Sequence, residues 1–279
     1  MTAKQNSSRK TAPVEPKRKQ KASANRALMA QSARRQTTLT ARQLHEHRQE
    51  IADAGEYRER RKQLMEKPLM RGWIHLVTFP LCVAASIVLI CLAPAGAMKA
   101  AVSIYSATAM LLFGVSAALH IGHGHVYTRI DSILVRIDYS NIFLVIAGTN
   151  TPFLFAITNT TVRWVYLVVI WAVALIGTAV HLVFPDGLDW LFTIVYCVLG
   201  LAPFTIIHLF WTSPYIGPVP TILLICGGAA YILGAVCFAL RKPNPWPRVF
   251  GYHELFHLGT VIGYACHLVA IFMTVCAMR

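Results

Sequence analysis

Residues 251–277 read GYHELFHLGTVIGYACHLVAIFMTVCA, an apolar run long enough for one membrane-spanning helix. Two histidines, His253 and His257, stand four residues apart near its start, and His267 follows ten residues later. Residues four apart lie on one face of a helix, so the first two imidazoles point the same way. Ionisable side chains inside membrane spans are costly and are usually functional. The stretch therefore indicates a membrane helix that begins with a polar site.

Six further apolar runs precede this one, and turn-forming or charged segments separate them. The seven runs cover about residues 73–94, 101–122, 133–157, 163–184, 190–212, 219–240 and 251–277. The composition is 56% hydrophobic and 14% charged, which is typical of a polytopic membrane protein. The sequence predicts an all-α integral membrane protein in which seven transmembrane helices form one domain, residues 68–279.

Residues 1–67 are predicted to form a basic, cytoplasmic and largely disordered tail. Residues 1–71 hold 18 of the 26 Lys and Arg residues and 7 of the 12 Asp and Glu residues. Residues 1–38 contain one acid, Glu15, and no aromatic residue, a composition that favours disorder. Residues 39–66 favour a solvated, partly helical linker, and the alternative is an amphipathic helix on anionic lipid headgroups.

Two other interpretations of the basic tail need weighing. Aromatic residues do not interleave with the basic ones, so nucleic-acid binding is not expected. An Arg-rich, acid-poor start is also compatible with an organelle transit peptide, and that alternative stays open.

The distribution of Lys and Arg predicts the orientation, because cytoplasmic loops are enriched in these residues. With the basic tail inside, the inner loops hold Arg129, Arg136, Arg241, Lys242 and Arg248, and the outer side holds Lys99, Arg163 and Arg279. We therefore expect a multi-pass protein of the cell membrane with its N-terminus in the cytoplasm and its C-terminus outside.

Three predicted spans bring polar residues to one depth near the cytoplasmic boundary. The second span ends with Ser116 and His120, the third carries Asp138 near its start, and the seventh opens with His253 and His257. Three neutral imidazoles suit zinc and leave its fourth position open, as in catalytic sites. Zinc lowers the pKa of bound water to about 7. Asp138 can serve as the base for that water or orient a histidine, and Ser116 can hydrogen-bond a substrate carbonyl.

A histidine in a span can also serve in a hydrogen bond between helices, and this alternative stays open for the three candidate ligands. It is the expected role of the solitary histidines, which are His75, His181 and His208. His267 lies about 15 Å beyond His257 along the helix axis, too far to share a metal. We assign it to a cavity wall or an interhelical hydrogen bond. His123 and His125 are rival ligands, but their loop position favours an interfacial role.

At these motifs the sequence resembles the hemolysin III family, within the wider group that includes the progestin and adipoQ receptors. The resemblance covers about residues 68–277 and rests on RGWIHLVTFP (71–80), SAALH (116–120), DYSNIFLVIAGTNTPF (138–153) and HELFHLGTVIGYACH (253–267). It implies seven helices and a cytoplasmic-side zinc bound by His120, His253 and His257, with Ser116 and Asp138 completing the site. For the wider group it also implies metal-dependent hydrolysis of lipid-like amides.

The chain departs from the family pattern in two places. Many members carry a Glu and an Asn before the histidine of the first span, where this chain has Met70, Arg71, Gly72 and Trp73. Residues 1–67 have no counterpart in the family pattern.

Three functions are compatible with these features. The first is a zinc-dependent hydrolase of an amide or ester of a membrane lipid. The second is a non-enzymatic regulator or receptor that senses membrane composition and uses zinc as a structural ligand. The third is the pore-forming cytolysin that the family name implies, against which seven apolar spans without a polar stripe argue. Asp138 separates the first two, because a structural zinc needs no acid that activates water.

Overall fold

A computed structural model of the chain describes residues 22–34, 68–122, 129–184 and 189–279, together with isolated residues between 43 and 55. The chain divides into two units, Met1–Met65 and Glu66–Arg279. His123 and His125, the rival ligands considered above, lie outside the described residues.

The described part of the first unit contains a helix where the sequence analysis predicts disorder. Residues 22–34, ASANRALMAQSAR, are helical, and all of their side chains are exposed. Alanine, leucine, methionine, arginine and glutamine have the highest helix propensities, and they make up most of this segment. The prediction of disorder rested on the lack of core-forming residues, which does not weigh local propensity. Most of the remaining tail lies outside the described residues.

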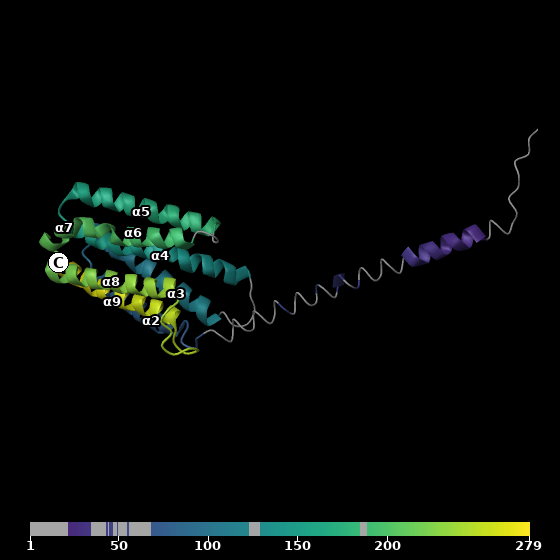
Figure 1. The fold of residues 1–279 in the computed structure, drawn as a ribbon. Coiled ribbons are helices and arrows are strands. Elements are labelled where there is room, and N and C mark those ends of the chain that lie inside the picture. Colours follow the sequence, from purple (N-terminus) through teal and green to yellow (C-terminus); the bar gives the residue numbers. More distant parts are fainter. Residues whose placement is uncertain are drawn as a thin grey trace, which may run out of the picture. The chain divides into compact units, whose positions relative to one another are not determined.

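The second unit is a bundle of long helices that run roughly side by side (Figure 1). The long helices are α2 Trp73–Leu92, α3 Ala97–Gly122, α4 Arg129–Ala156, α5 Thr160–Val183, α8 Pro218–Leu240 and α9 Tyr252–Ala277. Between α5 and α8 the chain forms α6 Asp189–Leu201, the 3₁₀ helix η1 Ala202–Ile206 and α7 Ile207–Thr212. The described residues of this unit otherwise contain one isolated β-bridge, between Trp246 and Phe250. The all-α prediction is confirmed.

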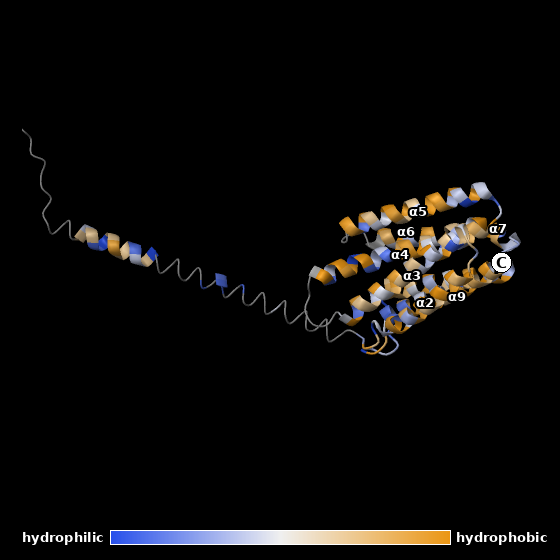
Figure 2. Ribbon diagram, turned by 180° about the vertical axis from the view of Figure 1, so that it is seen from behind, coloured by the Kyte–Doolittle hydropathy of each residue, from blue (hydrophilic) through white to orange (hydrophobic). Residues whose placement is uncertain are grey.

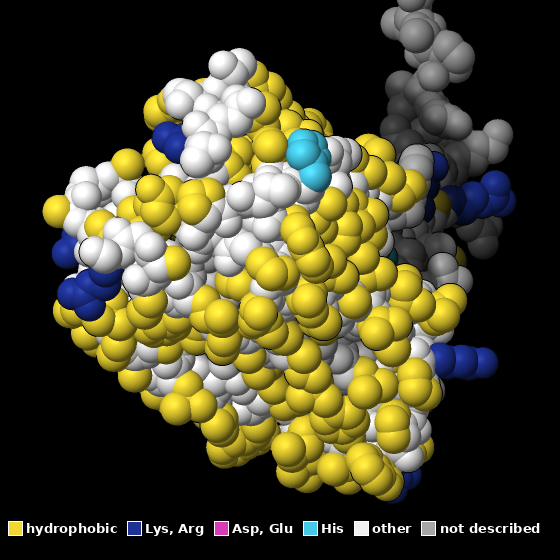
Figure 3. Space-filling model, turned by 90° about the vertical axis from the view of Figure 1, so that its left-hand side faces the viewer, with side chains coloured by type: hydrophobic (Ala, Val, Ile, Leu, Met, Phe, Trp, Pro, Cys, Tyr) yellow, Lys and Arg dark blue, Asp and Glu magenta, His cyan; other side chains and the backbone are white. Residues whose placement is uncertain are grey.

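Six helical segments of the described residues are long and apolar enough to cross a membrane. They are Trp73–Leu92, Ala97–Gly122, Thr160–Val183, Leu191–Thr212, Pro218–Leu240 and Tyr252–Ala277. Hydrophobic residues, drawn in orange, make up most of the length of the bundle's helices in Figure 2. They also cover most of the end-on face in Figure 3, where no acidic side chain is visible. These features define a multi-pass membrane protein.

The remaining predicted span, 133–157, corresponds to α4, which differs from the other long helices in composition. It is 28 residues long, but its first ten residues include Arg129, Asp131, Arg136 and Asp138. α4 is not among the six apolar segments. The predicted fifth span, 190–212, is interrupted at η1, where Pro203 occupies one of the first positions. Proline lacks the N–H that a continuous α-helix needs, which accounts for the break.

Helix packing fixes the start of α9 against its neighbours. α9 contacts α8, α2 and α4, and α3 lies against both α2 and α4. The α8–α9 contact is close because glycines face it: a Cβ added at Gly259 would lie 2.8 Å from the Ala230 carbonyl oxygen and 3.2 Å from the Gly234 Cα. Small residues at such positions let two backbones approach in a membrane. Gly259 lies two residues after His257, so this contact holds the first turns of α9 in place.

Candidate metal centre

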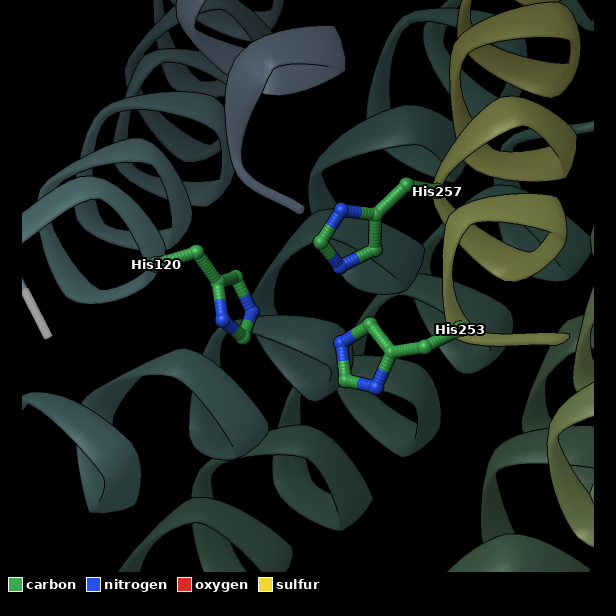
Figure 4. A group of neighbouring side chains, drawn as sticks. All are labelled: His120, His253 and His257. Carbon is green, nitrogen blue, oxygen red and sulfur yellow. The ribbon is translucent and has the colours of Figure 1, made fainter. Parts of the chain in front are cut away.

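Three histidines from two helices form a cluster at the end of the bundle where α3 ends and α9 begins. His120 comes from α3, and His253 and His257 come from successive turns of α9. Each ring turns a nitrogen toward the space between the three rings (Figure 4). One candidate ligand atom from each residue lies within 4.8 Å of the other two. The spacing of four residues on α9 and the antiparallel course of α3 together produce this arrangement.

The donor set fits a transition metal such as zinc. Three nitrogens bound to tetrahedral zinc lie about 3.3 Å from one another, given Zn–N distances of about 2.0–2.1 Å. The greatest separation of 4.8 Å in the cluster therefore has to close by about 1.5 Å. Small rotations of the three side chains provide this, since the ring centroids are 4.7–4.9 Å apart. The same donor set also suits copper, iron and nickel, so the geometry indicates a metal without naming it.

The two other predicted site residues lie beside the histidines. Asp138, near the start of α4, places its Oδ2 3.8 Å from Nε2 of His120. Ser116 lies one turn before His120 on α3, is 2% exposed, and is a polar neighbour of Asp138. The structure thus brings together all five residues that the sequence analysis selected, from α3, α4 and α9.

His75 extends the cluster on the α2 side. Its ring stacks on that of His257, with centroids 3.9 Å apart and planes 12° from parallel. Its Nε2 lies 2.9 Å from Oγ1 of Thr260, which donates to the carbonyl oxygen of His257. His75 therefore makes the interhelical hydrogen bond expected of it, and it also supports a candidate ligand. That second role was missed, because α2 and α9 are distant in the sequence.

The other buried histidines serve between helices. His267 on α9 donates from Nε2 to the carbonyl oxygen of Leu224 on α8, at 3.1 Å. Of the two roles considered for His267, the structure shows the interhelical hydrogen bond. His181 on α5 lies with Nδ1 3.5 Å from the Ser140 hydroxyl of α4. Neither residue belongs to the cluster of three histidines.

A buried ion pair fastens the segment before α2 to the start of α9. Glu254 stands between the two α9 histidines in the sequence, and its side chain is fully buried. Its Oε1 accepts from Nε of Arg71 at 3.0 Å, and its Oε2 accepts from the backbone N–H of Gly251 at 2.8 Å. Glu254 thus caps α9 and neutralises an arginine from another segment. Sequence reasoning missed this pair, and its one local signal was an acid three residues after a glycine at a helix start.

Backbone contacts complete this fastening. The N–H groups of Leu69 and Met70 donate to the carbonyl oxygens of Arg248 and Val249, at 2.9 and 3.1 Å. Gly72, with φ of 88°, sits so close to α3 that an added Cβ would lie 2.8 Å from Cβ of His120. The segment 68–72 therefore touches both helices that carry the candidate ligands, at the position where the chain departs from the family pattern.

A helical multi-pass membrane bundle with a Ser-His-Asp and His-His arrangement at one end defines a narrow class of protein. The model of the family described as Haemolysin-III related matches residues 63–268, and the chain belongs to this family. Hemolysin-3 from Bacillus cereus is 26% identical over 209 residues, which are 74% of this chain and 90% of that protein. The Hemolysin-3 homolog of Bacillus subtilis (strain 168) is 28% identical over 155 residues, 56% of this chain and 68% of that protein. The resemblance inferred from the motifs is confirmed.

Proposed function

We propose that the protein is a zinc-dependent hydrolase of an amide or ester of a membrane lipid, with His120, His253 and His257 as the zinc ligands. The observation that carries this proposal is the position of Asp138, whose Oδ2 lies 3.8 Å from Nε2 of His120, one of the three candidate ligands. A purely structural metal needs its ligands but no such acid. Zinc, when bound, polarises a carbonyl group and makes water nucleophilic near neutral pH.

The residues around the ligands have separate roles in this proposal. Asp138 accepts the proton from the attacking water, since its carboxylate reaches the side of the cluster next to His120. Ser116, a polar neighbour of Asp138, helps to orient that carboxylate. In this proposal Ser116 orients Asp138 and does not hydrogen-bond the substrate carbonyl as predicted from the sequence. Arg71 and Glu254 keep α2 and α9 in register around the site.

We also propose that α4 spans the membrane, which gives seven spans. Its four charged residues all lie in its first ten positions, and residues 139–156 contain no Asp, Glu, Lys or Arg. Eighteen helical residues extend about 27 Å, close to the thickness of the hydrocarbon core. With the N-terminus in the cytoplasm of the cell, seven spans place the cluster at the cytoplasmic boundary and the C-terminus outside. A site at that depth can meet the amide or ester region of a lipid of the inner leaflet.

The name of the relatives, Hemolysin-3, favours a cytolysin as the second candidate. Large side chains fill the bundle interior, and Phe113, Phe143, Phe153 and Phe210 are fully buried. This packing supports a hydrolase over a pore formed within one chain.

Release of fatty acid from membrane lipids tests the proposal. The purified protein in lipid nanodiscs is incubated with N-acyl amides and with ester lipids, and products are measured by mass spectrometry. We expect product from one class, its loss after treatment with a metal chelator, and its return when zinc is added. Undiminished release after complete removal of metal would contradict the proposal.

A further inference from the structure

Hydroxyl groups from three helices meet in the interior of the bundle, away from the histidine cluster. Ser86 of α2, Tyr105 of α3 and Tyr264 of α9 are 2%, 1% and 5% exposed. Within the described part of the chain, none of the three side-chain oxygens has a hydrogen-bond partner. Tyr264 lies seven residues beyond His257, about 10 Å further along the axis of α9. These groups therefore belong to a separate polar region, closer to the middle of the bundle.

The groups lie near one another without bonding to one another. Ser86 and Cys82, one turn apart on α2, are polar neighbours of the Tyr264 hydroxyl. The Tyr105 ring lies nearly parallel to that of Tyr264, with planes 19° apart and centroids 6.1 Å apart. Polar groups that are near each other but too far apart for a direct hydrogen bond are commonly bridged by water.

Physical chemistry disfavours leaving these groups unpaired. A tyrosine hydroxyl that is buried in a protein usually has a partner. An unsatisfied polar group inside a bundle loses its hydration without compensation. Buried water molecules typically make about three hydrogen bonds to groups of this kind. Three hydroxyls and the Cys82 thiol supply enough donors and acceptors for such a molecule.

We infer that ordered water occupies the interface of α2, α3 and α9 beside Ser86, Tyr105 and Tyr264, forming a buried hydration site. The Phe113 ring lies between these regions in the chain of ring contacts, since it contacts both His75, beside the histidine cluster, and Tyr264. The ring centroids are 5.1 and 5.0 Å apart in these two contacts. The hydration site is thus distinct from the candidate metal centre, and it does not depend on the proposed hydrolase.

The sign of a stability change tests the inference. Replacement of an unpaired buried hydroxyl by hydrogen stabilises a protein, whereas loss of a hydroxyl that binds water destabilises it. We expect Tyr105→Phe and Tyr264→Phe each to lower the Tm in nanodiscs by about 2–4 °C. Tyr215→Phe is the control, since Tyr215 is 39% exposed, and it should leave the Tm unchanged. An unchanged or raised Tm in both interior variants would overturn the inference.

A second measurement does not need variants. Brief X-ray radiolysis produces hydroxyl radicals from water, including water bound inside a protein, and these radicals oxidise the side chains beside it. We expect oxidation of Tyr105 and Tyr264 in the native protein, although both are buried. Phe143 and Phe153, which are fully buried elsewhere in the bundle, serve as internal controls. Oxidation of the two tyrosines no greater than that of the two phenylalanines would contradict a hydration site.

Discussion

Replacement of Arg71 by alanine should destabilise the bundle by leaving a buried charge without its partner. Glu254 is fully buried, and among the described residues its carboxylate keeps, without Arg71, the one hydrogen bond from the Gly251 N–H. Removing one member of a buried ion pair costs about 3–5 kcal/mol. The Arg71 side chain is 18% exposed, so we take the lower value of about 3 kcal/mol. For a protein of this size, that corresponds to a fall in Tm of about 6–12 °C.

Thermal unfolding in nanodiscs, followed by tryptophan fluorescence, measures this change. Adding Glu254→Gln to Arg71→Ala should recover most of the lost stability, because the unpaired charge is then removed. Arg136→Ala is the matched control: Arg136 donates to the carbonyl oxygen of Leu182 in an exposed position, so its loss should cost about 1 kcal/mol or less. The reasoning is refuted if Arg71→Ala changes the Tm no more than Arg136→Ala, or if the double variant is no more stable than Arg71→Ala.

Three other predictions concern the site and the topology. Asp138→Asn should keep the metal, since three imidazoles remain, and should lower turnover about 10²- to 10⁴-fold. Metal analysis and a lipid-hydrolysis assay of the same variant check this, and full activity would exclude Asp138 as the base. Ser116→Ala should lower turnover about fivefold, in line with one polar contact of about 1 kcal/mol, because Asp138 stays near His120; a loss as large as that of Asp138→Asn would show that Ser116 acts directly. Reporter fusions at residue 30 and after Arg279 should lie on opposite sides of the membrane, and two fusions on one side would exclude seven spans.

The helices and the candidate site could largely be predicted from the sequence, for physical reasons that apply to helical membrane proteins. In a membrane, an apolar run of about 20 residues has to form a helix, so run lengths predict the helices. Because successive spans run in opposite directions, the end of the second run and the start of the seventh lie at the same side of the membrane. The i, i+4 spacing of His253 and His257 places both on one face of their helix. The depth of His120 in the membrane follows from the alternating direction of the spans. Membrane topology therefore makes a three-dimensional site readable from linear spacing.

Other features could not be predicted, because they depend on side-chain contacts between distant segments. Arg71 and Glu254 are 183 positions apart, and neither follows a periodic pattern that predicts the pair. The stacking of His75 on His257 depends on the rotation of α2 about its own axis, which apolar periodicity does not determine when lipid surrounds much of the helix. The helix at residues 22–34 reflects local propensity, which an argument from charge and core-forming residues does not weigh.

The metal content of the purified protein tests the central claim most directly. Elemental analysis of the wild type should find about one zinc per chain, held by three imidazoles. His253→Ala and His257→Ala should each remove it, whereas His208→Ala, at an exposed histidine outside the cluster, should retain it. A folded wild-type protein without metal, or metal content unchanged in both His253→Ala and His257→Ala, would contradict the account.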